Sequence, residues 1–231
     1  VPGLVSRVAD IPAENVRFHQ TYLGGGFGRR GSPSHIIEAA EIAKATGKPI
    51  QLVWTREDDI QQGPFRPASL MRIKAGIDND GNLIAWDAAR AGADISPDTF
   101  RSLLPALYSW MGDGMIEGVA NLSEWYFEKF ATDESSTEGL FEDYDHPNTR
   151  VTHMTVDHEL PMTFWRSVGH SYTAFAKESM IDEMAEAAGM DEVAFRLQNT
   201  QKTPRLNNVI RVASEHMAKM NPPEGHHLGF A

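Results

Sequence analysis

The chain contains no cysteine among its 231 residues. Disulfide bonds, cysteine-ligated zinc, iron–sulfur clusters and a thiol nucleophile are therefore excluded within this chain. No apolar run approaches the roughly 20 residues that a membrane-spanning helix needs. Residues 1–5 also lack the basic segment and the long apolar core of a signal peptide. The absence of cysteine does not identify a compartment, because it suits reducing and oxidising surroundings alike.

Basic residues are few relative to acidic ones. The chain has 21 lysines and arginines against 32 aspartates and glutamates, which gives a formal net charge of -11. A field of this sign repels phosphate backbones, so nucleic acid is not an expected partner. Hydrophobic residues make up 41% and charged residues 23% of the chain, which is typical of a globular protein. The length allows one large domain or two small ones.

The first 55 residues place a run of glycines between segments with regular patterns. Residues 16–22 alternate apolar and polar side chains, which predicts a strand with one wet or functional face. Four glycines lie among the five residues Gly24 to Gly28, and they allow a sharp turn and a close approach to a ligand. Ser32-Pro33 predicts a helix start, Gly47 predicts its end, and the apolar residues 50–54 predict a second strand.

A hairpin and a further strand are expected along the next hundred residues. Residues 70–78 alternate, and Asn79-Asp80-Gly81 is a turn sequence from which the chain returns as a second strand. Residues 92–150 show no clear period. Their acidic stretch, Asp133 to Asp145, contains no lysine or arginine and predicts a solvated loop or insertion. Residues 151–157 predict another strand.

The last third is predicted to be helical. Gly189 ends a helix whose apolar face includes Ile181 and Met184, Asp191 caps the next helix, and Thr203-Pro204 begins a third. The expected fold class is α+β, with mixed sheets and helices packed on one side. We expect one subdomain over 1–150, which includes the irregular insertion at about 92–150, a helical subdomain over 151–220, and a linker-like tail over 221–231.

The glycine run permits more than one function. A tight turn without a ligand is one interpretation. Gly26, Gly28 and Gly31 also satisfy the G-x-G-x-x-G spacing of dinucleotide-binding loops, and Glu57 stands where a ribose-binding acid would follow. A nicotinamide-dinucleotide-dependent dehydrogenase is therefore an alternative. Against it, the leading segment is half polar, whereas a central parallel strand is apolar along its length, and the pattern stops after one unit.

Four groups of residues together carry a more specific signal. They are the glycine loop Thr21–Arg30, the segment Gly47–Asp59, a second loop Phe164–Ser171, and the pair Glu178–Glu183 and Phe195–Asn199. In this order they resemble the molybdopterin-binding large subunit of the xanthine dehydrogenase and aldehyde oxidase family. The resemblance is closest to the bacterial isoquinoline 1-oxidoreductase beta-subunit branch, which includes aldehyde-oxidising members. It covers most of the chain except roughly residues 92–150.

This resemblance implies a molybdenum cofactor held by a pterin dithiolene. No residue of this chain is assigned as a metal ligand. The residues that it assigns to cofactor binding are Gly25, Gly26, Phe27, Gly28 and Arg166. It places Val168 at the substrate pocket. Trp165, which precedes Arg166, is a second candidate for the pocket. Its simpler interpretation is packing in the core. For Arg166 the simpler role is a structural ion pair, but Gly169 and the helix start at Ser171 repeat the design of the first loop and favour a site.

The implied reaction is hydroxylation of an aldehyde or N-heterocycle with water as the oxygen source and a glutamate as general base. Preorganised N–H donors stabilise an anionic metal centre, and a glycine loop before a helix offers them. Some purine-oxidising members carry an acid shortly after the loop, where Gly31 and Ser32 stand here. Purines are therefore disfavoured as substrates.

Two parts of the family's site are missing from the sequence. The family's general base lies in a Gly-Glu-Pro segment near the end of the subunit, and a glutamine-bearing loop precedes the glycine loop; neither occurs here. We therefore expect an internal fragment, or one subunit of a split enzyme, that alone is inactive and binds no cofactor. The catalytic glutamate is expected outside this chain.

The expected partners follow from the same resemblance. They are the remaining segments of the same large subunit, an iron–sulfur subunit and a small-molecule substrate, in the bacterial cytoplasm or periplasm. In the complete enzyme the cofactor is expected to be the dinucleotide form of molybdenum–molybdopterin. A non-catalytic module that only docks to partner chains is the second alternative. A large exposed apolar face would be consistent with this hypothesis and equally with the hypothesis of a fragment.

Overall fold

The computed structural model describes residues 1–156 and 159–231. The chain forms two compact units that interleave along the sequence. Their segments are, for unit 1, Val1–Ala68, Gly92–Ser136 and Thr155–Val168, and, for unit 2, Ser69–Ala91, Thr137–Met154 and Gly169–Ala231. The units differ from the division at residue 150 expected from the sequence, because each gathers segments that are far apart in the chain.

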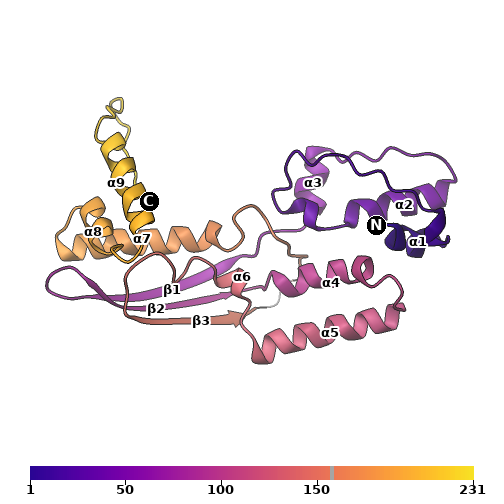
Figure 1. Cartoon of the computed structure of the whole chain (residues 1–231), viewed down its shortest axis with the longest axis horizontal. Coiled ribbons are helices and arrows are strands. Elements are labelled where there is room, and N and C mark those ends of the chain that lie inside the picture. Colours follow the sequence, from indigo (N-terminus) through magenta and orange to yellow (C-terminus); the bar gives the residue numbers. More distant parts are fainter. Residues whose placement is uncertain (157–158) are drawn as a thin grey trace. The chain divides into compact units, whose positions relative to one another are not determined.

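Unit 2 contains a three-stranded sheet with the order β1-β2-β3 (Figure 1). Strands β1 (Ser69–Ile77) and β2 (Leu83–Gly92) form the predicted hairpin. In its turn, the Asp78 carboxylate accepts hydrogen bonds from the backbone N–H groups of Asp80 and Asn82. Gly81 has a φ of 81°, which glycine adopts without a steric penalty. The hairpin and its turn are therefore confirmed.

Strand β3 (Asn148–Thr155) lies beside β2 and runs parallel to it. The side-chain partners advance together along the two strands: Asn148 donates to the Ile84 carbonyl, Arg150 pairs with Asp87, and Arg90 contacts His153. A parallel neighbour requires a long crossover connection. The sheet is therefore mixed, as expected. The strand predicted over 151–157 is present but begins and ends earlier, and Asp157 lies outside the described residues.

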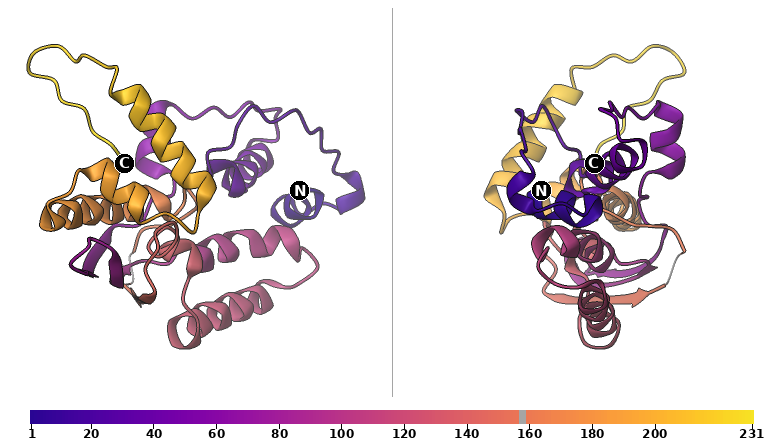
Figure 2. Two further views of the ribbon diagram at one scale, coloured as in Figure 1. Left: turned by 60° about the vertical axis from the view of Figure 1, so that its left-hand side comes forward. Right: turned by 90° about the vertical axis from the view of Figure 1, so that its right-hand side faces the viewer.

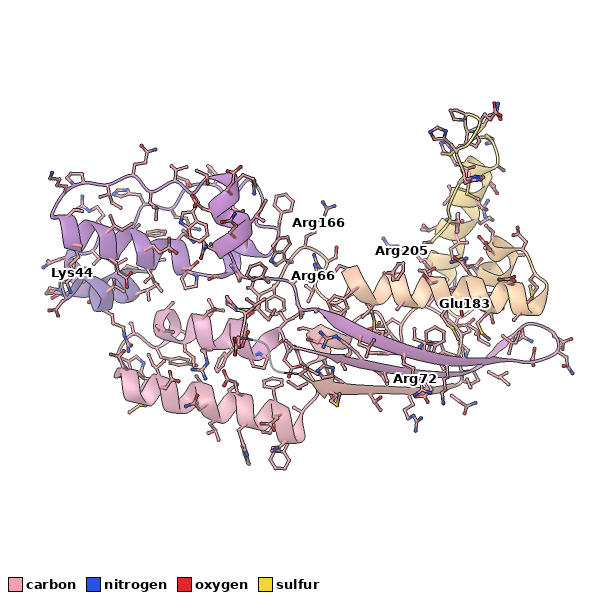
Figure 3. All side chains as sticks on the ribbon, turned by 180° about the vertical axis from the view of Figure 1, so that it is seen from behind. Lys44, Arg66, Arg72, Arg166, Glu183 and Arg205 are labelled. Atoms are coloured by element: carbon pink, nitrogen blue, oxygen red, sulfur yellow. The ribbon has the colours of Figure 1, made fainter. Side chains whose placement is uncertain are left out.

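Helix α7 (His170–Ala188) packs on one face of this sheet (Figure 1). The core between them consists of Leu83, Trp86, Ala88, Leu140, Ile181, Met184, Ala185 and Phe195. The opposite face carries the exposed side chains of Arg72 and Lys74 (Figure 3 labels Arg72). One buried and one charged face explain the alternation in β1. These contacts confirm the α+β class with helices on one side.

Two shorter helices follow α7, and both begin where the sequence predicts. The Asp191 carboxylate accepts from the N–H groups of Val193 and Ala194 at the start of α8 (Glu192–Gln198), as an N-cap does. Helix α9 (Pro204–Met217) begins after Thr203. The tail, residues 221–231, has no helix or strand (Figure 2).

Unit 1 is helical in the part of the chain that the structure describes. Helix α1 (Pro2–Ala9) packs on α2 (Ser34–Thr46), and α3 is Arg56–Gln62. Helices α4 (Ser96–Leu107) and α5 (Asp113–Phe130) pack around Leu104, Ile116 and Ala120. No helix in the described residues is both long and apolar enough to span a membrane.

Helices α4 and α5 correct the expectation of an irregular insertion at 92–150. Pro97 and Pro105 lie within α4, and Gly114 and Gly118 lie within α5. Pro97 lies in the first turn of α4, where proline is tolerated, but Pro105 and the two glycines lie in helix interiors, where they are unfavourable and conceal the helical period. Tertiary packing of the two helices overrides the local preference.

Both strands predicted beside the glycine run are absent from the structure. Residues 16–22 and 50–54 form neither helix nor strand, because no described segment pairs with them to satisfy a ladder of backbone hydrogen bonds. The helix predicted from Ser32-Pro33 begins at Ser34, with Pro33 as its N-cap. Its predicted end is confirmed, since Gly47 caps it with a φ of 63°.

The acidic stretch at 133–145 is not a solvated loop throughout. Asp133 is only 1% exposed, before the short helix α6 (Glu134–Thr137). Its carboxylate accepts from the backbone N–H groups of Ile95 and Ser96 and from the Ser136 hydroxyl. Burial raises the pKa of Asp133, but these hydrogen bonds outweigh it and hold the pKa below its usual range. The prediction was wrong here because a carboxylate with enough donors can be buried.

Candidate functional site

Two loops of unit 1 dock against each other: loop 1, residues 24–28, and loop 2, residues 164–168. The backbone N–H of Arg166 donates to the carbonyl oxygen of Phe27, with an N···O distance of 2.9 Å. A Cβ atom added at Gly28 would overlap the carbonyl oxygen of Phe164 and lie 2.8 Å from the Cα of Trp165. Glycine at position 28 is therefore what allows the two loops to approach.

Both loops hold residues in the left-handed region of backbone space. Phe27 has a φ of 49° and Gly28 a φ of 86°, while in loop 2 Ser167 and Val168 have φ values of 72° and 44°. Each such non-glycine residue costs about 1–3 kcal/mol, and such residues concentrate at functional sites. A positive φ is especially unfavourable for the β-branched Val168. Surrounding contacts must therefore hold loop 2 in this form.

Arg66 supplies such contacts to loop 2. Its Nη2 donates to the Arg166 carbonyl at 3.0 Å and its Nη1 to the Val168 carbonyl at 3.1 Å. Its guanidinium carbon also lies 5.7 Å from the centroid of the Trp165 ring. Figure 3 labels both Arg66 and Arg166. Hydrogen bonds from a charged donor are worth about 1.5–3 kcal/mol each, which is enough to offset the strain of the loop.

Arg66 was not found from the sequence. Its partners are backbone carbonyls. Every residue has a backbone carbonyl, so the amino-acid sequence does not show which of them accept a hydrogen bond from Arg66. The only local signal is that Arg66 stands in the segment Gly63-Pro64-Phe65-Arg66-Pro67, whose prolines restrict the backbone. Without the fold, such a segment is typical of any exposed turn.

The surface formed by the two loops offers hydrogen-bond donors that have no acceptor. Within residues 1–156 and 159–231, the backbone N–H groups of Gly25, Gly26, Phe27 and Gly28 donate no hydrogen bond. The exposed guanidinium of Arg166 has no partner among the described residues either. Among residues 1–156 and 159–231, therefore, Arg166 does not form the structural ion pair that was considered for it. Free amides next to a free cation are suited to an anionic group.

The structure thus brings together all five residues predicted to bind the cofactor, four on loop 1 and Arg166 on loop 2. The Phe27 side chain is 68% exposed at this junction. Arg29, the next residue but one, does not belong to the free donors: it stacks on Trp54 at 5.3 Å and lies 3.6 Å from the Asp59 carboxylate. Its role is structural.

The two residues predicted at the substrate pocket lie in loop 2. Trp165 is 43% exposed, so it is not a core residue, and its Nε1 donates to the Pro64 carbonyl at 2.9 Å. Val168 is partly buried, and its N–H donates to the Trp165 carbonyl at 2.8 Å, which closes the turn of loop 2. Their contact with a substrate stays a prediction.

The structural context of a dinucleotide-binding loop is not present in the described residues. No strand precedes Gly26, and a short 3-10 helix, Arg29–Gly31, separates loop 1 from α2. Glu57 lies in the first turn of α3, where Thr55 and Asp58 form a capping box. The β–α–β unit that would give the G-x-G-x-x-G spacing its meaning is missing.

Comparison with known proteins identifies the family of the chain. The family model of the molybdopterin cofactor-binding domain matches residues 1–94 and 124–200. It therefore extends into the region 92–150 but omits 95–123, which contains α4 and part of α5. Isoquinoline 1-oxidoreductase subunit beta of Brevundimonas diminuta is 30% identical over 215 residues, which are 92% of this chain and 25% of that protein.

Two further proteins also match most of this chain over about a quarter of their own length. The molybdenum-binding subunit of aldehyde oxidoreductase from Escherichia coli K12 is 28% identical over 202 residues, which are 87% of this chain and 23% of that protein. The solved structure of quinoline 2-oxidoreductase from Pseudomonas putida 86 matches with a TM-score of 0.66 at 14% identity, over 94% of this chain and 27% of that one. At that identity the likeness shows the fold alone. The chain spans about a quarter of the length of these curated relatives.

Proposed function

Since the chain belongs to the molybdopterin cofactor-binding domain family, we propose that it is part of the molybdenum-binding subunit of a molybdenum hydroxylase. The reaction would oxidise an aldehyde or an N-heterocycle with water as the oxygen source. The observation that carries this proposal is the docked pair of loops, which places the free N–H groups of loop 1 and the free guanidinium of Arg166 on adjoining segments. The names of the relatives support both substrate classes and do not separate them.

The donor set fits the proposed cofactor. A molybdenum–pterin group carries anionic oxygen atoms, and loop 1 and Arg166 offer donors without a competing carboxylate. We assign the amides of Gly25 to Gly28 and the Arg166 guanidinium to holding it, in its dinucleotide form. When bound, the cofactor supplies the redox chemistry. The chain's own residues bind and orient it, because donors fixed in advance need no reorganisation when charge develops.

Loop 2 is assigned to the substrate side of this site. Val168 and Trp165 border the free donors through the same turn, so they are proposed to contact the substrate. No residue of the chain is assigned as the general base. The remaining parts of the same subunit and an iron–sulfur subunit are the proposed partners, and the isolated chain is expected to have no activity because the assigned site lacks a base.

Replacing Arg166 with glutamine tests the proposed function. The variant keeps a hydrogen-bond donor but removes the charge. Because charge-assisted hydrogen bonds are worth about 1.5–3 kcal/mol, retention of the cofactor is expected to fall about 10-fold or more. The measurement is the molybdenum and pterin content of the purified subunit that contains this chain.

The matched control is Arg205→Gln, at an exposed arginine on α9 that Figure 3 also labels. It is expected to retain the cofactor fully. If Arg166→Gln retains as much molybdenum as this control, Arg166 does not hold the cofactor.

A further inference from the structure

We propose that Arg66 is a positioning residue, which holds loop 2 in the form that presents Arg166 at the junction with loop 1. The effect on the cofactor rests on the proposed function above. The effect on loop 2 itself does not, because it follows from contacts within unit 1.

The first argument is the position of the two carbonyls that accept hydrogen bonds from the Arg66 guanidinium. Arg66 donates to the carbonyls of Arg166 and Val168, which lie on either side of Ser167. Ser167 and Val168 are the two residues of loop 2 with positive φ. One planar fork therefore links the carbonyls that bracket the strained part of the turn. Releasing the fork allows both residues to relax to ordinary backbone angles.

The second argument is that Arg66 forms no ion pair in the described part of the chain. Its guanidinium contacts no carboxylate there, and its other interaction is the cation–π contact with the Trp165 ring. A surface arginine is ordinarily solvated or paired with an acid. An arginine that donates hydrogen bonds to two carbonyls of one turn is suited to fixing the conformation of that turn.

The third argument is that Arg66 is itself held in place. The preceding residue, Phe65, donates its N–H to the Pro161 carbonyl at 2.8 Å and accepts from the N–H of Thr163 at 3.3 Å. The indole N–H of Trp165 donates to the carbonyl of Pro64. The segment that carries Arg66 is thus paired with the residues that lead into loop 2. A positioning residue must be anchored in this way, since a mobile one fixes nothing.

The test is amide hydrogen exchange of the 231-residue chain, followed residue by residue by NMR, in Arg66→Met and Arg66→Lys. We expect the N–H groups of Arg166 and Val168 to exchange at least about tenfold faster in both variants, since local opening becomes easier. Lysine is not expected to restore protection, because a point charge does not span two carbonyls as a planar fork does. Amides of α7 and the urea midpoint are expected to stay unchanged.

The control is Arg72→Met, at an exposed arginine on β1. The proposal is overturned if both Arg66 variants exchange within about twofold of the wild type at Arg166 and Val168, which is the scatter expected of a neutral surface change. It is also overturned if lysine restores full protection, since charge alone would then suffice. If Arg66→Met does not fold, Arg66→Lys decides. No cofactor enters this experiment, so failure of the proposed function leaves its result intact.

Discussion

Gly28→Ala is expected to separate the two loops and to abolish stable binding of the cofactor. Gly28 has a φ of 86°, and an alanine there costs about 1–3 kcal/mol in backbone strain alone. Its Cβ would in addition overlap the Phe164 carbonyl, which is backbone and cannot turn aside. The hydrogen bond from Arg166 to Phe27 joins the same two segments and would be lost with them.

Two measurements report this change. In the chain, the Arg166 N–H should lose its protection from hydrogen exchange. In the subunit that contains the chain, molybdenum content should fall at least about tenfold, since each 1.4 kcal/mol is a factor of ten. Gly24→Ala is the matched control, because it lies in the same loop with no atom within 4 Å of an added Cβ. Equal molybdenum in the two variants would contradict the role of the close approach.

Arg196→Met is expected to destabilise unit 2 strongly. Arg196 is 1% exposed on α8, and its guanidinium pairs with Glu178 at 3.1 Å and with Asp182 at 2.6 Å, both on α7. The Tyr144 hydroxyl also donates to Glu178. Methionine fills much of the space but leaves these acids without their cation. Removing one partner of a buried pair costs about 3–5 kcal/mol, and this cost applies mainly to Glu178, whose side chain is 18% exposed, because the Asp182 side chain is 39% exposed and is stabilised by water.

Urea unfolding of the chain measures this loss. Arg211→Met provides the comparison, because Arg211 pairs with Glu215 on α9 with half of its side chain exposed. Exposed pairs contribute about 0–1 kcal/mol, so this variant should stay close to the wild type. A free energy of unfolding for Arg196→Met that equals the value for Arg211→Met would show that the buried network does not stabilise unit 2.

The elements that the sequence predicts correctly are those decided by neighbouring residues. The β1–β2 hairpin depends on Asp78 and Gly81 in its own turn, and the ends of α2 and α7 depend on Gly47 and Gly189. Each of these signals acts within a few residues. The two strands predicted at 16–22 and 50–54 failed for the opposite reason: a strand needs a distant partner, and alternation of side chains does not supply one.

The candidate site shows the same limit. Sequence motifs assigned both loops, but nothing in them says that the Phe27 carbonyl accepts from Arg166 or that Gly28 meets Phe164. Arg66 is the clearest case, because carbonyl partners are invisible in a sequence. The roles of Trp165 and Val168 toward a substrate depend on a ligand and stay predictions.

The central claim is that loops 1 and 2 together bind the molybdenum cofactor. Anomalous scattering at the molybdenum absorption edge, from crystals of the cofactor-loaded subunit that contains this chain, tests it directly. We predict a molybdenum peak beside the junction of the loops, with the backbone of Phe27 and Gly28 and the Arg166 guanidinium as the nearest groups of this chain. A peak remote from both loops would contradict the account.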